Sequence, residues 1–153
     1  MSENIDEKDR RLLRALQSDA GQSLEALASD LSMSTNTCWR RVKRMEDAGI
    51  LQRRVALVDP EAVGLGQTVF VEVRTRDHSA AWLAKFADAV KAIPEVIEFY
   101  RMAGDVDYLL KIQTASVRDY DRVYKSLISK IDVSNVSATF SMECIKNTTE
   151  LPI

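Results

Sequence analysis

The chain has 153 residues and a formal net charge of −2, with 46% hydrophobic and 29% charged residues. This composition predicts an ordered globular protein of one medium or two small domains. Because it has no membrane-length apolar run and no signal peptide in residues 1–11, we expect it in the cytoplasm, with no membrane partner. The chain has two cysteines far apart in sequence, Cys38 and Cys144, and a single histidine, His78. These residues exclude a disulfide framework and a zinc site, so we expect no cofactor and no metal.

The first predicted helix runs from Asp6 to Ser18. Asp6 and Asp9 suit an N-cap and a first turn, where negative charge meets the positive end of the helix. Its apolar side is formed at helical spacing by Leu12, Leu13 and Leu16.

Two further amphipathic helices, joined by a tight turn, are predicted between Ser23 and Leu51. Ser23 caps the first of them, and Ser34 caps the second after a break at residues 32–33. Gly49 stands where a C-cap glycine is preferred. The apolar positions are Leu24, Leu27, Ala28 and Leu31 in the first helix and Cys38, Val42 and Met45 in the second. Residues 1–51 are therefore predicted to form a helix-turn-helix, winged-helix-like domain.

The outer face of the second of these helices is basic. From residue 39 to residue 54, six basic residues stand against two acidic ones, a balance of plus four in an acidic chain. Such a patch is typical of a nucleic-acid-binding element, although a solvated helix face is the alternative. Trp39 either lies against the DNA backbone or supports the domain against the first helix. We expect base-edge contacts from Asn36, Thr37 and Arg40, and phosphate contacts from Ser34, Arg41, Lys43, Arg44, Arg53 and Arg54.

Residues 52–67, QRRVALVDPEAVGLGQ, are predicted to connect two domains. Val55 and Leu57 indicate a short strand, and the step from Asp59 to Pro60 indicates a turn after it. Alternatively, the strand residues pair with the same segment of another subunit.

Residues 68–153 alternate strands and helices. Strands are predicted over 68–75, 96–102, 107–114 and 136–144, and helices over 79–92 and 116–131, with Cys144 on the apolar side of the last strand. This order predicts an α+β protein whose C-terminal domain is ferredoxin-like, βαββαβ, with both helices on one face of the sheet. The other face then needs a cover, and face-to-face dimerisation would supply it.

The order of these segments resembles the Lrp/AsnC family of feast/famine transcriptional regulators over nearly the whole chain. The stretches that carry the resemblance are IDEKDRRLLRALQSDA, NTCWRRVKRMEDAGIL, VALVDPEAVGLGQ, AGDVDYLLKI and the closing KNTTELPI. Ser32 departs from the pattern, because many helix-turn-helix turns carry glycine there. The resemblance implies a DNA-binding domain joined to a ligand-sensing dimerisation domain, a response to amino acids, and homodimers that assemble into octamers of four dimers.

The resemblance also implies a place for the effector, where dimers meet. A free amino acid carries an ammonium and a carboxylate; Asp105 or Asp107 would accept the first, and the backbone at Gly104 would donate to the second. The alternative is a plain hairpin turn, for which Gly-Asp is ordinary. The expected effector-site residues are Met102, Gly104, Asp105, Asp107, Asn135, Ser137 and Thr139, the last three from a neighbouring dimer.

We therefore expect a non-enzymatic, sequence-specific regulator whose binding to double-stranded DNA, or whose assembly, responds to a small effector, an amino acid. A symmetric dimer predicts a pseudo-palindromic site with half-sites about one helical turn apart, or a multiple of that. Two alternatives stay open: a ligand-independent architectural DNA-binding protein, and an enzyme like the siroheme decarboxylases, which share a similar two-part architecture. Against an enzyme, the sequence has no nucleophile–base pair, phosphate loop or metal cluster.

Overall fold

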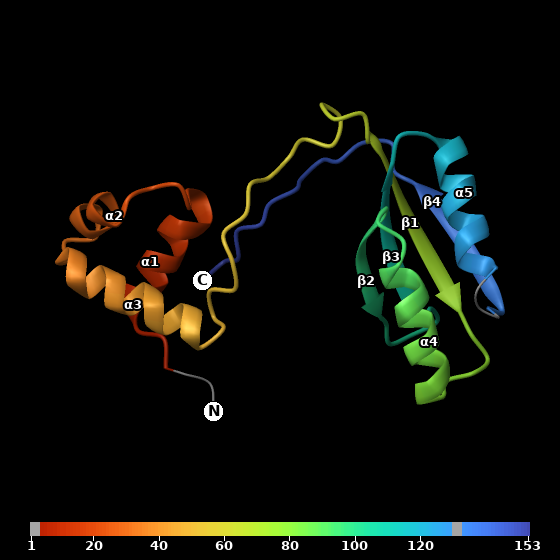
Figure 1. Cartoon of the computed structure of the whole chain (residues 1–153), viewed down its shortest axis with the longest axis horizontal. Coiled ribbons are helices and arrows are strands. Elements are labelled where there is room, and N and C mark those ends of the chain that lie inside the picture. The colour runs from red at the N-terminus through yellow and green to blue at the C-terminus, as the bar shows by residue number, and fades with distance from the viewer. Residues whose placement is uncertain (1–3, 130–132) are drawn as a thin grey trace. The chain divides into compact units, whose positions relative to one another are not determined.

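Figure 1 shows the computed structural model of the chain, which describes residues 4–129 and 133–153. The chain forms two compact units, residues 1–56 together with 146–153, and residues 57–145. The sequence predicts a C-terminal domain that extends to residue 153, whereas residues 146–153 belong to the first unit. The predicted short strand at residues 55–57 is not formed in the single chain, where no described segment pairs with it and its side chains are exposed.

Three helices make the body of the first unit: α1 (Glu7–Ser18), α2 (Leu24–Asp30) and α3 (Thr35–Asp47). A capping box opens α1, since the backbone N–H of Asp9 donates to Asp6 Oδ1 over 2.8 Å and that of Asp6 donates to Asp9 Oδ2 over 3.1 Å. Apolar positions predicted from helical spacing form a single hydrophobic core, made of Leu12, Leu13, Leu16, Leu27, Ala28, Cys38, Val42 and Met45.

The same C-terminal motif ends both α2 and α3. After α2, the N–H of Met33 donates to the carbonyl of Ala28, and Ser32 between them takes a left-handed backbone with φ of 53°. After α3, the N–H of Ile50 donates to the carbonyl of Met45, and Gly49 has φ of 70°. The departure at Ser32 therefore changes the residue and not the geometry of the turn.

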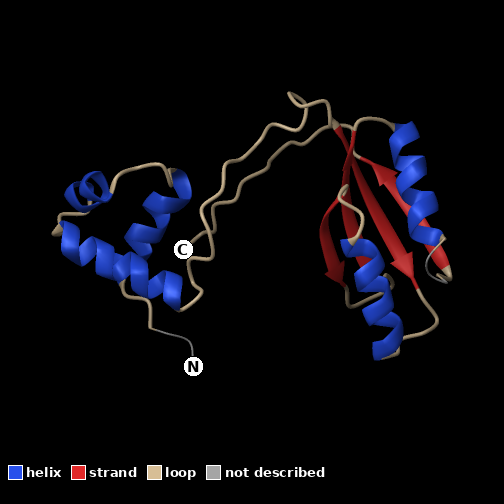
Figure 2. Ribbon diagram, viewed as in Figure 1, coloured by secondary structure: helices blue, strands red, loops and turns tan. Residues whose placement is uncertain are grey.

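The second unit is a four-stranded antiparallel sheet in the order β2-β3-β1-β4, with two helices (Figure 2). In chain order its elements are β1 (Gln67–Arg74), α4 (Ala80–Lys91), β2 (Val96–Arg101), β3 (Tyr108–Thr114), α5 (Val117–Ile128) and β4 (Asn135–Phe140). Both helices pack on the same face of the sheet, where Phe86 and Val90 of α4 share one core with Val123 and Leu127 of α5. The predicted ferredoxin-like domain is confirmed; Ile131, predicted in the second helix, lies outside the described residues.

The last strand is shorter than predicted. It pairs with β1 from Asn135 to Phe140, and the N–H of Ser141 then donates to the carbonyl of Thr68 near the start of β1. Beyond that point β1 offers no further partner, so Met142 is fully exposed and Cys144 is exposed instead of lying on an apolar face.

The face of the sheet opposite the helices is mixed in character. Phe70, Tyr100 and Leu109 share it with charged side chains such as Lys111, which pairs with Glu98 over 3.0 Å. No helix in the described residues is long and apolar enough to cross a membrane.

Candidate nucleic-acid interface and effector loop

The candidate DNA interface is built on α3. Ser34 caps this helix: its Oγ accepts from the N–H of Thr37 over 3.2 Å and lies 2.8 Å from the Thr37 hydroxyl. Asn36 follows in the first turn with an exposed side chain. A helix that presents polar side chains on its first turn has the arrangement by which recognition helices contact base edges.

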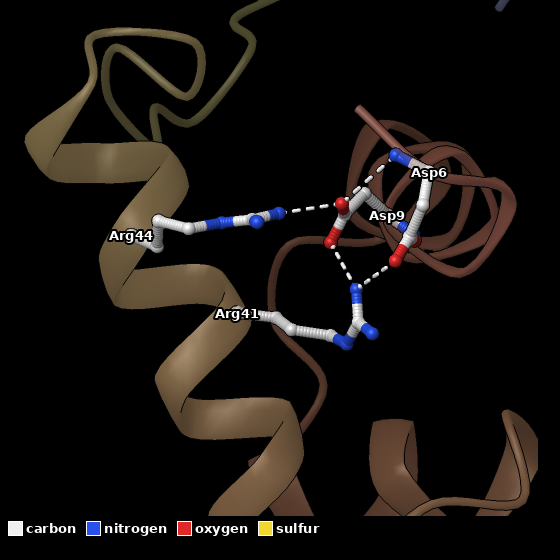
Figure 3. A network of polar contacts seen from close by, with 4 residues as sticks. All are labelled: Asp6, Asp9, Arg41 and Arg44. Carbon is white, nitrogen blue, oxygen red and sulfur yellow. Dashed lines mark hydrogen bonds and ion pairs between the residues drawn. The ribbon is translucent and has the colours of Figure 1, made fainter. Parts of the chain in front are cut away.

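The second part of the interface is a network of four charged residues that ties α3 to α1 (Figure 3). Arg41 Nη1 donates to Asp6 Oδ2 and to Asp9 Oδ1, over 2.7 Å in each case. Arg44 Nη2 donates to the other oxygen of Asp9. Asp9 itself is fully buried. The Arg41 guanidinium, for which the sequence predicts a phosphate contact, is therefore paired with two carboxylates in this structure.

The pKa values of this network reflect its hydrogen bonds. Donation by Arg41 and by the backbone N–H of Asp9 lowers the pKa of Asp6 from 3.8 to about 2. The two carboxylates in turn raise the pKa of Arg41. In the core beneath, burial raises the pKa of the Cys38 thiol, which makes it a poor nucleophile.

The other basic residues differ in whether they form ion pairs. Lys43 pairs with Asp47 over 2.8 Å, and Arg54 lies 3.7 Å from Glu46. Arg40 makes no ion pair with any described residue.

A hollow of about 450 Å³ lies over the middle and the end of α3. It is lined by Trp39, Arg40, Lys43, Arg44, Asp47 and Ala48. Trp39 is 52% exposed, which favours a role at this surface over support against the first helix. A basic hollow with an exposed aromatic ring suits a sugar-phosphate chain.

The candidate effector loop joins β2 to β3. Gly104 has φ of 132°, a conformation that favours glycine, and Met102 and Asp105 are exposed. Asp107 differs from Asp105, because its Oδ2 accepts from the buried N–H of Thr75 over 2.8 Å. The loop therefore offers one exposed carboxylate, on Asp105, and one that holds the end of β1.

The three expected residues of the last strand share one face. Asn135, Ser137 and Thr139 are exposed and lie opposite Arg74, Glu72 and Phe70 in the register of β4 with β1. They lie on the face of the sheet opposite the helices.

Sequence reasoning missed two features. The sequence places Asp9 in the first turn of a helix, and nothing local signals its second role as the partner of two arginines more than thirty residues away. A hollow of about 380 Å³ beside the end of β1 was also missed; it is lined by Thr75, Arg76, Asp77, Trp82 and Ser134. No group of side chains in residues 4–129 and 133–153 could hold a metal ion.

Comparison with known proteins matches both units. Residues 5–52 match a family model described as winged helix-turn-helix DNA-binding, and residues 68–151 match the Lrp/AsnC ligand binding domain. The chain is 48% identical to the glutamate uptake regulatory protein of Zymomonas mobilis, over all of this chain and 93% of that one. It is also 48% identical to the DNA-binding transcriptional activator DecR of Escherichia coli K12, over 97% and 99%.

Solved structures agree with these matches. An AsnC family transcriptional regulator from Agrobacterium tumefaciens superposes with a TM-score of 0.93 at 50% identity, over 96% of each chain. A transcriptional regulator of Neisseria meningitidis in complex with L-Met superposes with a TM-score of 0.91 at 32% identity, over 97% of each chain.

Proposed function

Because this chain belongs to the Lrp/AsnC family of transcriptional regulators, and so is an effector-responsive DNA-binding regulator and not an enzyme, we propose that its effector is a free amino acid held at the loop between β2 and β3. The single observation that carries this proposal is the pairing of an exposed carboxylate at Asp105 with the open backbone at Gly104. A regulator of this family with L-Met bound has the same fold, which supports the same chemical class of ligand.

The loop assigns different roles to its two acids. Asp105 makes no ion pair with a described residue, so its carboxylate is available for the ammonium of a ligand. Asp107 already accepts from the N–H of Thr75, and it serves to hold the loop against β1. Asn135, Ser137 and Thr139 would complete the site from a neighbouring dimer, and Met102 would supply an apolar wall.

For the DNA half, we propose that α3 lies in the major groove. Asn36 and Thr37 would read base edges, while Ser34 and Lys43 would contact phosphates. Arg40, for which the sequence predicts a base contact, lines the hollow over α3 together with Arg44, and we propose a phosphate contact for it. The chain would act as a homodimer, four of which form an octamer, on a pseudo-palindromic site, and it would do so in the cytoplasm beside the chromosome.

The test is a thermal-shift screen of the purified protein with each of the twenty amino acids. Millimolar ligand over a micromolar site adds about 4 kcal/mol to the free energy of unfolding, so a true effector gives a clear rise in melting temperature. The Asp105→Asn variant should lose this rise and keep the melting temperature of the free protein. If no amino acid shifts the melting temperature of the wild-type protein, the proposed effector class is wrong.

A further inference from the structure

The buried carboxylate of Asp9 has more partners than a helix cap needs. It accepts from the N–H of Asp6, as a capping box requires, and also from two guanidinium groups of α3 (Figure 3). A fully buried carboxylate is costly unless opposite charge and hydrogen bonds compensate it. Because both oxygens of Asp9 are occupied from α3, this residue fixes the helix that carries the DNA-contacting side chains.

The two arginines held by Asp9 are not equivalent. Arg41 donates one nitrogen to both Asp6 and Asp9, its side chain is 20% exposed, and its Nε is buried without a partner in the described residues. A phosphate that approached Arg41 would meet two carboxylates beside it. The positive charge of Arg41 is therefore compensated by carboxylates of the protein itself.

Arg44 keeps part of its guanidinium free. It gives Nη2 to Asp9, while its side chain is 42% exposed. It stands one helical turn from Arg40, and these two residues line both the hollow over α3 and a smaller hollow of about 300 Å³ beside Asp6 and Arg41. A guanidinium already fixed by a carboxylate loses less conformational entropy when its remaining N–H groups bind an anion.

We infer that Asp9 is a positioning residue for DNA binding, which holds Arg44 beside Arg40 so that the two arginines bind adjacent backbone phosphates, one each, and which withdraws Arg41 from the DNA. This inference rests on α3 being the recognition helix, as proposed above. It assigns affinity for phosphate to Arg40 and Arg44, and rigidity of the interface to Arg41.

The salt dependence of DNA binding tests this assignment. The probe is a short duplex that the wild-type protein selects from a random-sequence pool, and the readout is the slope of log Kobs against log salt concentration by fluorescence anisotropy. Loss of one phosphate contact lowers the magnitude of this slope by about 0.9. Arg40→Gln and Arg44→Gln should each do so, whereas the matched variant Arg41→Gln should keep the slope and lower the melting temperature.

A double-mutant cycle tests the role of Asp9. In the wild-type background, Arg44→Gln should weaken binding about tenfold at about 0.1 M salt. In the Asp9→Asn background the same change should cost less than about threefold, because Arg44 is no longer held in place. Arg40→Gln should cost the same in both backgrounds, as a control for a general loss of structure.

Two results would overturn the inference: a slope lowered by Arg41→Gln as much as by Arg40→Gln, or an equal cost of Arg44→Gln in both backgrounds. Circular dichroism melts identify any variant that does not fold. If Asp9→Asn does not fold, the inference is judged by the salt slopes of Arg40→Gln and Arg41→Gln. A wild-type protein that selects no sequence from the pool would instead contradict the proposed recognition by α3.

Discussion

At the scale of single residues, the candidate sites are governed by which charges are already paired. Composition and spacing place Arg40, Arg41 and Arg44 on one basic helix. They do not show which of these arginines is available to bind DNA. The distinction comes from Asp6 and Asp9, since Arg41 pairs with both carboxylates and Arg44 pairs with Asp9 alone. The same reasoning separates Asp105 from Asp107 in the effector loop, since only Asp107 holds a backbone N–H.

Acid should weaken the network through Asp6. Its pKa is lowered to about 2 in the folded protein, so its carboxylate stabilises the fold in full above pH 3.8 and loses this effect as the pH falls toward about 2. Asp6→Asn keeps a good N-cap and removes the charge. We expect the variant to melt below the wild type at neutral pH and to converge with it near the lower pKa. Thermal melts against pH measure this, with the exposed Asp30→Asn as a control; a constant difference at all pH values would contradict it.

Removing the carboxylate of Asp107 should destabilise the second unit even in the absence of ligand. Asp107→Ala leaves the N–H of the buried Thr75 without its acceptor, which costs about 1–3 kcal/mol. Asp105→Ala removes only an exposed side chain, so it should change the free energy of unfolding by less than about 0.5 kcal/mol. Chemical denaturation of both variants measures the contrast, and equal effects would remove the distinction between the two acids.

At the scale of elements, periodicity predicts most of the fold. Capped amphipathic patterns predict α1 and α3, and the alternation of apolar and polar residues predicts β1. These predictions hold because each of these elements is stabilised by the burial of one face. Alternation continues to residue 144, yet β4 ends at Phe140, since a strand also needs a partner and β1 has none left. The pairing of Asp9 with α3 could not be predicted, because no periodic pattern relates residues so far apart in sequence.

The turn between α2 and α3 should accept glycine with a gain in stability. Ser32 has φ of 53°, where a residue with a Cβ is strained by about 1–2 kcal/mol, while glycine costs about 0.5–1 kcal/mol of chain entropy. Ser32→Gly should therefore raise the free energy of unfolding by about 0.5–1 kcal/mol. Gly49→Ala, at φ of 70° in the equivalent turn after α3, should lower it by about 1 kcal/mol. Denaturant titration compares the two; destabilisation by Ser32→Gly would show that the serine side chain stabilises the turn.

At the scale of the whole molecule, the chain returns to its first unit after completing its second. Residues 146–153 belong to the first unit, so two segments of chain connect this unit to the second. The side-chain amide of Gln17 makes two hydrogen bonds with the backbone of Leu151. The N–H of Leu151 donates to Gln17 Oε1 over 2.7 Å, and Gln17 Nε2 donates to the carbonyl of Leu151 over 3.2 Å. A tail without hydrophobic periodicity gives no sign of this docking in the sequence.

This attachment predicts a local effect on hydrogen exchange. Gln17→Ala removes the acceptor of the Leu151 N–H, and a lost hydrogen bond of about 1 kcal/mol corresponds to exchange about fivefold faster at that amide. Amides in the core of α3 should keep their protection, because the helix packs through Cys38, Val42 and Met45 and not through the tail. Gln52→Ala, in the exposed connector, is the control and should leave Leu151 unchanged. Unaltered exchange at Leu151 in the Gln17→Ala variant would contradict the protection of this amide by Gln17.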